Sequence, residues 1–220
     1  MKQLLEEALK RVKPTLHERD KLEEFCELVV EKLREKGYGA ELEGSLAKDT
    51  WVSGNHDVDI FMFFEKSVGR EELEKTGLEV GKKVIKELGG KPEIAYAEHP
   101  YARAKIGNFD LDIVPCYRVE SAGELQCAVD RTPFHTEYVQ RHMTEEEKGQ
   151  VRLLKQFMKG VGIYSAKEKV RGFSGYLCEL LILKYGSFKK LLRAAKDWEY
   201  GTVIDLEKYY KSKKIGRAHV

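Results

Sequence analysis

The stretch DVDIFMFF, residues 57–64, decides the fold of this chain. It is rich in β-branched and aromatic residues, and it carries acidic side chains only at its first and third positions. Successive side chains of a strand point to opposite faces, so Asp57 and Asp59 share one face, with Cβ atoms roughly 7 Å apart. We therefore predict a buried strand that presents two carboxylates on one side.

Two carboxylates on one face of an apolar strand repel each other and are tolerated where a cation lies between them. A later apolar strand offers a third acid, Asp110 or Asp112, and because these positions have the same parity, their spacing does not choose between them. Such oxygen ligands suit Mg²⁺, which keeps water and phosphate oxygens in its shell. Three carboxylates that hold two metal ions meet the requirement of in-line phosphoryl or nucleotidyl transfer, so the pattern favours that class of enzyme.

The segment before this strand has features of a phosphate-binding loop. Gly44 lets the backbone approach a phosphate closely, and Ser45 is expected to open a short helix over residues 46–50 whose first amides attract anions. Lys48 adds positive charge one turn later. The chain holds no G-x-x-x-x-G-K-[ST] pattern, so a P-loop enzyme is excluded.

Composition and charge exclude several other classes. The 220 residues carry 39 Lys and Arg against 37 Asp and Glu, a net charge of +2, which excludes a histone-like polycation and a disordered acidic chain. No window approaches the ~18 consecutive apolar residues of a membrane helix, and no secretory or transit signal fits the N-terminus. The four cysteines are scattered without a C-x-x-C pair, which argues against a zinc ribbon or a disulfide scaffold and predicts a reducing cytoplasm.

The order of the predicted elements gives an α+β half followed by a helical half, with the likeliest linker near residues 121–123. Capping boxes at Thr15 and Thr144 predict two helix starts, and Gly107-Asn108 predicts a two-residue hairpin loop. The expected strands cover residues 57–64, 93–97, 101–106 and 109–114, and the expected helices include residues 70–88, 146–160, 174–185 and 187–198.

The C-terminal residues 206–220 are predicted to be a truncated tail. Residues 215–220 match the translation of a common DNA-sequencing adapter, so we expect these six residues not to be natural and leave them out of the fold prediction. A native stop codon after residue 220 in the resequenced locus would contradict this expectation.

The Gly-Ser step, the acid pair and the later strand aspartate together resemble the signature of the DNA polymerase β-like nucleotidyltransferase superfamily. Longer stretches narrow the resemblance to the archaeal, class I CCA-adding tRNA nucleotidyltransferases, over a span from near residue 1 to about residue 206. These stretches are AEHPY (97–101), DIVPCY (112–117), VDRTPFH (129–135) and KVRGFSGYLCELL (169–181). Several long motifs in the right order make the resemblance specific.

The resemblance implies a fold and a metal site. It implies a polymerase β-like head over residues 1–120, a small mixed sheet flanked by helices, followed by a partial helical central or neck domain over residues 121–205. In that family the strand acids ligate two Mg²⁺ ions, which maps onto Asp57, Asp59 and Asp112. The family often has Glu at the first of these positions, a change that preserves the charge.

The resemblance also implies a set of nucleotide-binding residues, which contact the triphosphate from the loop and from the helical part. They map onto Gly44, Ser45, Lys48, His135, Lys155 and Tyr164, with Arg131 in the same motif as His135. The family usually has Arg where this chain has Lys48. It is also roughly twice as long, with the segments that select the base and hold the tRNA beyond residue 214.

The implied function is Mg²⁺-dependent addition of CCA to the tRNA 3′ end from CTP and ATP, with release of pyrophosphate, in the cytoplasm and without a membrane partner. One alternative is a stand-alone nucleotidyltransferase that acts on another RNA, a protein or a small molecule. Another is a non-catalytic RNA-binding derivative, against which the intact acids argue. The oligomeric state stays open, with a homodimer as one option.

Overall fold

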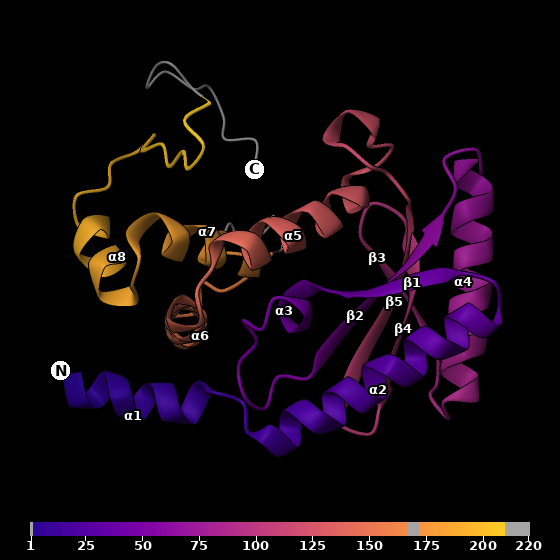
Figure 1. Ribbon diagram of the computed structural model, residues 1–220, viewed down its shortest axis with the longest axis horizontal. Coiled ribbons are helices and arrows are strands. Elements are labelled where there is room, and N and C mark those ends of the chain that lie inside the picture. Colours follow the sequence, from indigo (N-terminus) through magenta and orange to yellow (C-terminus); the bar gives the residue numbers. More distant parts are fainter. Residues whose placement is uncertain (1, 167–171, 210–220) are drawn as a thin grey trace. The chain divides into compact units, whose positions relative to one another are not determined.

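A computed structural model describes residues 2–166 and 172–209 of the chain (Figure 1). The adapter-like residues 215–220 and the first part of the motif at 169–181 lie outside the described residues. The described chain forms two compact units, one made of residues 14–141 and the other of residues 2–13 together with those from 142 onward. The boundary near residue 120 between a head and a helical domain, which the resemblance implies, stays a prediction.

The unit of residues 14–141 is built on one five-stranded sheet with the order β1-β2-β5-β4-β3. Its strands are β1 (Gly39–Glu43), β2 (Asp57–Phe64), β3 (Glu93–Tyr96), β4 (Pro100–Ile106) and β5 (Phe109–Tyr117). The β2–β5 pair is parallel and the other pairs are antiparallel, so the predicted small mixed sheet is confirmed.

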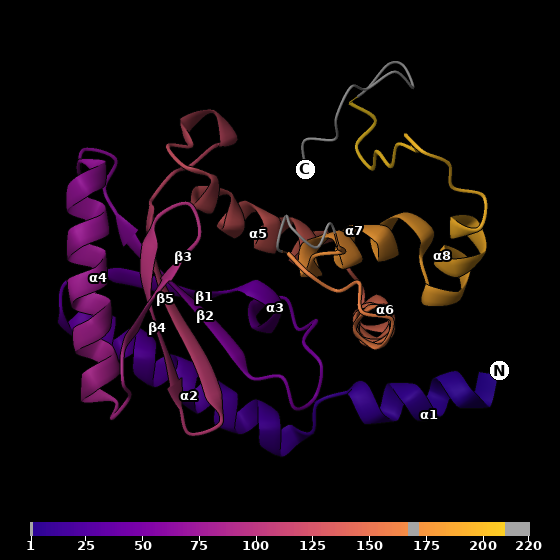
Figure 2. The same ribbon diagram turned by 180° about the vertical axis from the view of Figure 1, so that it is seen from behind.

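Two helices, α2 (Leu16–Glu35) and α4 (Arg70–Glu87), cover one face of this sheet (Figure 2). The core between these helices and the sheet includes the even-numbered apolar residues of β2. They are buried, as the alternation of side chains along the strand predicts. The helix α4 lies very close to the sheet, since a Cβ on Gly81 would stand 2.8 Å from Cβ of Ala102. The carboxylates of β2 therefore lie on the opposite face.

Several element boundaries differ from the prediction by one to three residues, among them those of β5, α3 and α8 (Phe188–Ala195), the last of which ends at Ala195 rather than at residue 198. Strand β5 extends to Tyr117, past Pro115, although it was expected to end at residue 114. The amides of even-numbered residues along β5 donate toward β2, so the amides of odd-numbered residues face β4. Pro115, which has no N–H, therefore lacks its donor on the β4 side. No hydrogen bond is lost there, because the pairing of β5 with β4 already stops at Ile113. The short helix α3 spans Gly44–Ala47 rather than residues 46–50, because Gly44 adopts a φ of +70° and starts the turn earlier.

The other unit is helical. It contains α1 (Lys2–Val12), α6 (Glu145–Gly160), α7 (Gly175–Tyr185) and α8 (Phe188–Ala195). Helix α1 packs on α6 through Gly149, where an added Cβ would lie 3.2 Å from Leu9. No helix in the described ranges has the length and apolar character needed to cross a bilayer.

The connection between β5 and the second unit contains two short 3-10 helices, η1 (Ala122–Glu124) and η2 (Ala128–Arg131), and then α5 (Thr132–His142). Both predicted capping boxes are confirmed, at Thr15 with Glu18 and at Thr144 with Glu147. The four cysteines are free and buried.

Candidate active site

The parallel pairing of β2 and β5 places four acids side by side on the sheet face opposite α2 and α4. Asp57 lies next to Asp110, and Asp59 lies next to Asp112, in register. Asp110 is exposed, whereas only 14% of the Asp112 side chain is exposed. The charge of Asp112, and not that of Asp110, is among the causes that raise the pKa of Asp59, so Asp112 is the strand acid that faces it more closely.

Asp59 is the most strongly perturbed of these acids. Burial raises its pKa to about 7, and the negative charges of Asp112 and Asp57 add to that effect. The backbone of Gly44 lies directly on its carboxylate, because a Cβ at that residue would stand 2.0 Å from Asp59 Oδ2. Only glycine fits at this position, so the Gly-Ser step and the central acid form one site.

Asp112 is bound by an arginine on the neighbouring strand. Arg103 Nε donates to Asp112 Oδ1 at 2.6 Å, and Arg103 Nη2 donates to Asp112 Oδ2 at 2.5 Å. The same Nη2 donates to the hydroxyl oxygen of Tyr101 at 2.9 Å. Asp57, at the start of β2, accepts a hydrogen bond of 2.6 Å from the side-chain amide of Asn55.

The donor set fits a divalent metal ion by its chemistry. Asp57, Asp59 and Asp112 supply only oxygen ligands, which suit a hard divalent cation. Burial raises the pKa of Asp59, and the charges of Asp112 and Asp57 raise it further. In the described ranges, no three His, Cys, Asp or Glu side chains form a ready-made metal cage, since Asp57 and Asp112 are turned to Asn55 and Arg103. The acids therefore lie in register on neighbouring strands, where a metal ion could draw them together.

Two charged side chains flank the acids on the β1 side. Glu43 pairs with Asp59 across β1 and β2 and is buried, which raises its pKa to about 7. Lys48 is also buried, and its positive charge lowers the pKa of both acids in opposition to burial. The loop cation predicted from the sequence thus lies within electrostatic reach of Asp59.

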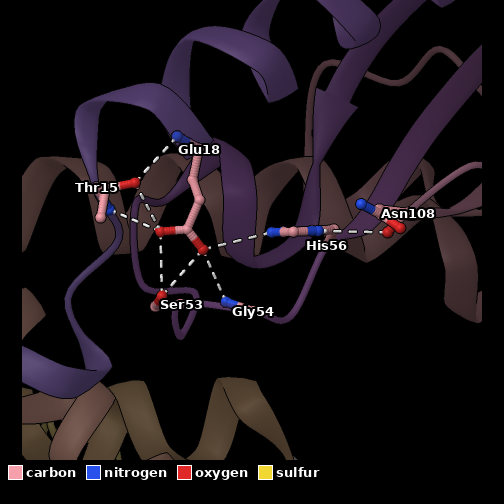
Figure 3. Close-up of polar contacts among 6 residues, drawn as sticks. All are labelled: Thr15, Glu18, Ser53, Gly54, His56 and Asn108. Carbon is pink, nitrogen blue, oxygen red and sulfur yellow. Dashed lines mark hydrogen bonds and ion pairs between the residues drawn. The ribbon is translucent and has the colours of Figure 1, made fainter.

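The loop that leads into β2 is held by a carboxylate at the start of α2 (Figure 3). Glu18 accepts hydrogen bonds from the amide and hydroxyl of Thr15, the hydroxyl of Ser53 and the amide of Gly54. These bonds outweigh the effect of burial and lower the pKa of Glu18 to about 2. A capping residue of α2 therefore also fixes the chain just before Asp57.

A histidine extends this contact to the hairpin before β5 (Figure 3). His56 Nε2 lies 3.5 Å from Glu18 Oε1, and its Nδ1 lies 3.3 Å from the carbonyl oxygen of Asn108. The amide of Asp110 donates to the carbonyl oxygen of His56 at 3.0 Å. His56 thus connects the start of β2 to the start of β5.

Two further predicted nucleotide-binding residues belong to the same unit. His135 is half-buried in the first turn of α5. Arg131 is exposed at the end of η2, where its Nε donates to the carbonyl oxygen of Ala128 at 3.1 Å. Arg131 therefore contacts its own turn from an exposed position.

The last two predicted residues, Lys155 and Tyr164, belong to the helical unit and lie together there. A Cβ on Gly175, at the start of α7, would stand 3.0 Å from the Tyr164 hydroxyl and 3.7 Å from Lys155 Nζ. Lys155 is buried and donates to Glu179 at 3.0 Å, in a pair that is almost wholly removed from solvent. Lys155, which the resemblance predicts to be a phosphate ligand, thus forms a buried ion pair with Glu179 in this structure.

The sequence reasoning gave no role at the site to several residues that lie at or near the predicted ones. They are Arg103, Asn55, Glu43, Glu18 and Glu179. One of them had a usable signal, because a two-residue loop at Gly107-Asn108 pairs Arg103 with Asp112. The contacts of Glu18, Glu43 and Glu179 join distant segments, which local patterns do not contain, and the bond from Asn55 to Asp57 depends on the conformation of a loop.

Two hollows that the described residues line, of about 750 and 640 Å³, lie along α2 and β1. None of the candidate acids Asp57, Asp59 and Asp112 lines either of these two.

Two family models match the chain. One is described as a nucleotidyltransferase domain and matches residues 18–135. The other is described as tRNA nucleotidyltransferase, second domain, and matches residues 149–219. The two matches follow each other in the order of the α+β and helical parts.

Curated proteins named CCA-adding enzyme are similar to most of the chain. The one from Sulfurisphaera tokodaii is 48% identical over 201 residues, which cover 91% of this chain and 48% of that protein. The one from Saccharolobus shibatae is 48% identical over 203 residues, which cover 92% of this chain and 48% of that protein. The chain spans about half the length of the curated relatives it matches.

Solved structures share the fold at low sequence identity. A cytoplasmic RNA terminal U-transferase aligns with a TM-score of 0.60 at 16% identity, covering 83% of this chain and 52% of that one. CdnC from E. coli MS115-1, in complex with HORMA-deltaN, aligns with a TM-score of 0.65 at 18% identity, covering 95% of this chain and 75% of that one. At these identities the similarity supports the fold alone.

Proposed function

This chain belongs to the nucleotidyltransferase domain family, and on that premise we propose that it carries the catalytic part of a CCA-adding tRNA nucleotidyltransferase. The resemblance to archaeal CCA-adding enzymes that the motifs indicated is confirmed by the two family models and by the curated relatives. The reaction proposed is addition of C, C and A to the tRNA 3′ end from CTP and ATP.

One observation carries the proposal from the structure. Asp59 and Asp112 lie side by side on parallel strands, and Gly44 of the Gly-Ser turn lies against the Asp59 carboxylate. A phosphate held at that turn would lie beside the acids, which is the arrangement that a metal-assisted transfer of a nucleotidyl group requires.

Nucleotidyltransferases of this superfamily generally use divalent metal ions. We propose two Mg²⁺ ions here, held by Asp57, Asp59 and Asp112, which would supply positive charge against the phosphate oxygens and lower the pKa of the attacking hydroxyl. Ionised Asp59 is favoured once a cation neutralises the repulsion that raises its pKa.

We propose that the chain's own residues bind and orient the triphosphate. Gly44 admits the phosphate to the backbone, and Ser45 donates its hydroxyl or amide. Lys48 and Arg131 supply positive charge, and His135 and Tyr164 supply hydrogen-bond donors. Lys155 supplies an ammonium group that it shares with Glu179. In the reaction, the 3′-hydroxyl oxygen of the RNA forms a bond to the α-phosphorus, the bond to pyrophosphate breaks, and the hydroxyl proton leaves to water or a carboxylate.

The partners proposed are the 3′ end of tRNA, CTP and ATP, and the compartment is the cytoplasm. A homodimer stays a prediction. The match of residues 149–219 to the second domain of tRNA nucleotidyltransferases supports tRNA as the substrate, in preference to the other RNAs, proteins or small molecules that a stand-alone nucleotidyltransferase would use.

The test is incorporation of label from α-labelled CTP and ATP into a tRNA that lacks CCA, with Mg²⁺ and the purified chain. We expect label at the tRNA 3′ end, and we expect the Asp59→Ala variant to lose it by at least ~100-fold, since a group that stabilises transition-state charge is worth several kcal/mol. Lys105→Ala, an exposed change on the neighbouring strand, should keep the activity of the unmodified chain.

Three outcomes would contradict the proposal. Equal labelling of an unrelated RNA would indicate a general terminal transferase. Undiminished labelling by Asp59→Ala would remove this acid from the reaction. Binding of tRNA without any labelling, together with triphosphate affinity that does not respond to Asp59→Ala, would favour a non-catalytic RNA-binding derivative.

A further inference from the structure

The carboxylate of Asp112 has both of its oxygens bound by one guanidinium. Arg103 donates to the two oxygens in parallel, at 2.6 and 2.5 Å, from the opposed position on β4. Pairs of this geometry are the stronger class of charge-assisted hydrogen bond. A divalent cation that binds Asp112 uses at least one of the same oxygens, and its positive charge repels the guanidinium held there, so the guanidinium opposes metal binding.

Arg103 is held in this position by a second contact on its own strand. Its Nη2 donates to the Tyr101 hydroxyl at 2.9 Å, and its guanidinium carbon lies 5.5 Å from the centre of the Tyr101 ring. Tyr101 is buried, which fixes the ring. Half of the Arg103 side chain is exposed, so the guanidinium has solvent into which it can turn away.

We propose that Arg103 is a positioning residue that holds Asp112 as a counter-ion in the metal-free protein and gives up at least one carboxylate oxygen when a divalent cation binds. The proposal rests on the proposed function, in which Asp112 is a metal ligand. It explains how acids placed in register can belong to a stable sheet before any cation arrives. It also means that the affinity for metal is lower than the acids alone would provide.

The test measures binding of Mn²⁺ alone to the full chain, by electron paramagnetic resonance of the free ion, without nucleotide or RNA. We expect Arg103→Gln to bind Mn²⁺ roughly fivefold more tightly than the unmodified chain, the size expected for losing one partly exposed ion pair. The matched control is Lys105→Gln, which removes one exposed cation from the same face of β4, opposite Asp110, and should change the affinity less than twofold.

Thermal unfolding adds a second measurement. Arg103→Gln should lower the Tm without metal and enlarge the rise in Tm that Mn²⁺ produces. If Arg103→Gln does not fold, Arg103→Lys replaces it, because an ammonium group keeps the charge without making two parallel bonds and should also bind Mn²⁺ more tightly than the unmodified chain.

Asp112→Asn separates this inference from the proposed function. If Asp112→Asn weakens Mn²⁺ binding and Arg103→Gln leaves it unchanged or weaker, Arg103 is not a competitor and the inference is overturned. If Asp112→Asn has no effect, the assignment of Asp112 as a metal ligand is wrong, and the inference is overturned with it.

Discussion

Burial and the neighbouring acids Asp112 and Asp57 both disfavour the ionised form of the Asp59 carboxylate. Burial is the larger cause, and the resulting pKa of about 7 lies well above the usual value of an aspartate. A raised folded-state pKa means that stability is fully present below the pKa of the unfolded chain, about 4, and is lost as the pH rises through about 7. Above pH 7 the metal-free fold carries a charge that unfolding would release to water.

The variant Asp59→Asn should therefore stabilise the metal-free chain at pH 8, by about 2 kcal/mol, and flatten the pH dependence between pH 4 and 7. Urea unfolding at pH 5 and pH 8 measures both effects. Asp110→Asn, an exposed change on the same face, should alter the free energy of unfolding by less than about 0.5 kcal/mol. An equal pH dependence in Asp59→Asn and the unmodified chain would refute the electrostatic account.

The residues of this site were predictable to different degrees. Alternation along residues 57–64 predicted the shared face of the two acids, because side-chain direction in a strand is a local property. The choice of Asp112 over Asp110 required the family motif. The bond from Asn55 to Asp57 was not predicted, since the sequence does not specify the rotamers of a loop.

At the scale of elements, Glu18 serves two segments at once. It completes the capping box of α2, which the sequence predicted, and it also binds the loop before β2, which the sequence did not reveal because Ser53 and Gly54 are distant along the chain. Its lowered pKa of about 2 shows that the ionised form is the one the fold stabilises. The stabilisation is present above pH 4.5 and is lost as the pH falls toward 2.

We expect Glu18→Gln to lower the free energy of unfolding at pH 7 by about 2 kcal/mol, and to reduce the loss of stability between pH 4.5 and 2. The matched control is Glu147→Gln, which has the same place in the capping box of α6, where its carboxylate accepts from the amide and hydroxyl of Thr144. That control should cost about 0.5–1 kcal/mol. Equal costs for both variants, by urea unfolding, would show that Glu18 acts only as a cap.

The buried pair of Lys155 and Glu179 connects α6 to α7. Lys155→Met should destabilise the chain by about 3–5 kcal/mol, since it removes an ammonium group that lies 3.0 Å from a buried carboxylate oxygen. The double variant Lys155→Met with Glu179→Leu should recover most of that loss, as apolar replacement of a buried pair often does. Chemical unfolding of both variants measures this, and a double variant no more stable than Lys155→Met would contradict it.

For the molecule as a whole, the compact units do not follow the order of the chain. Residues 14–141 are continuous, whereas the helical unit joins α1 to helices that begin after residue 141. The contact of Leu9 with Gly149 is of this kind. Sequence patterns describe near neighbours, so they could not predict the packing partner of α1.

A fragment of residues 14–141 should therefore fold by itself, with a single cooperative urea transition, because its core is made of its own residues. Deleting residues 1–13 from the full chain should destabilise the helical unit by several kcal/mol, since it uncovers the apolar surface of α6 that α1 covers. Circular dichroism and amide hydrogen exchange distinguish the two units. Uniform protection of α6 and α7 after the deletion would contradict the division.

The reactivity of the buried cysteines measures how often each compact unit opens. Burial raises the pKa of the Cys26 and Cys178 thiols to about 12, so the folded protein presents almost no thiolate to an alkylating reagent at pH 8. Cys26 lies in the sheet unit and Cys178 in the helical unit. Peptide mass spectrometry can follow the rate at which each cysteine is alkylated. That rate therefore reports how often the unit that contains the cysteine opens, with no label added to the chain.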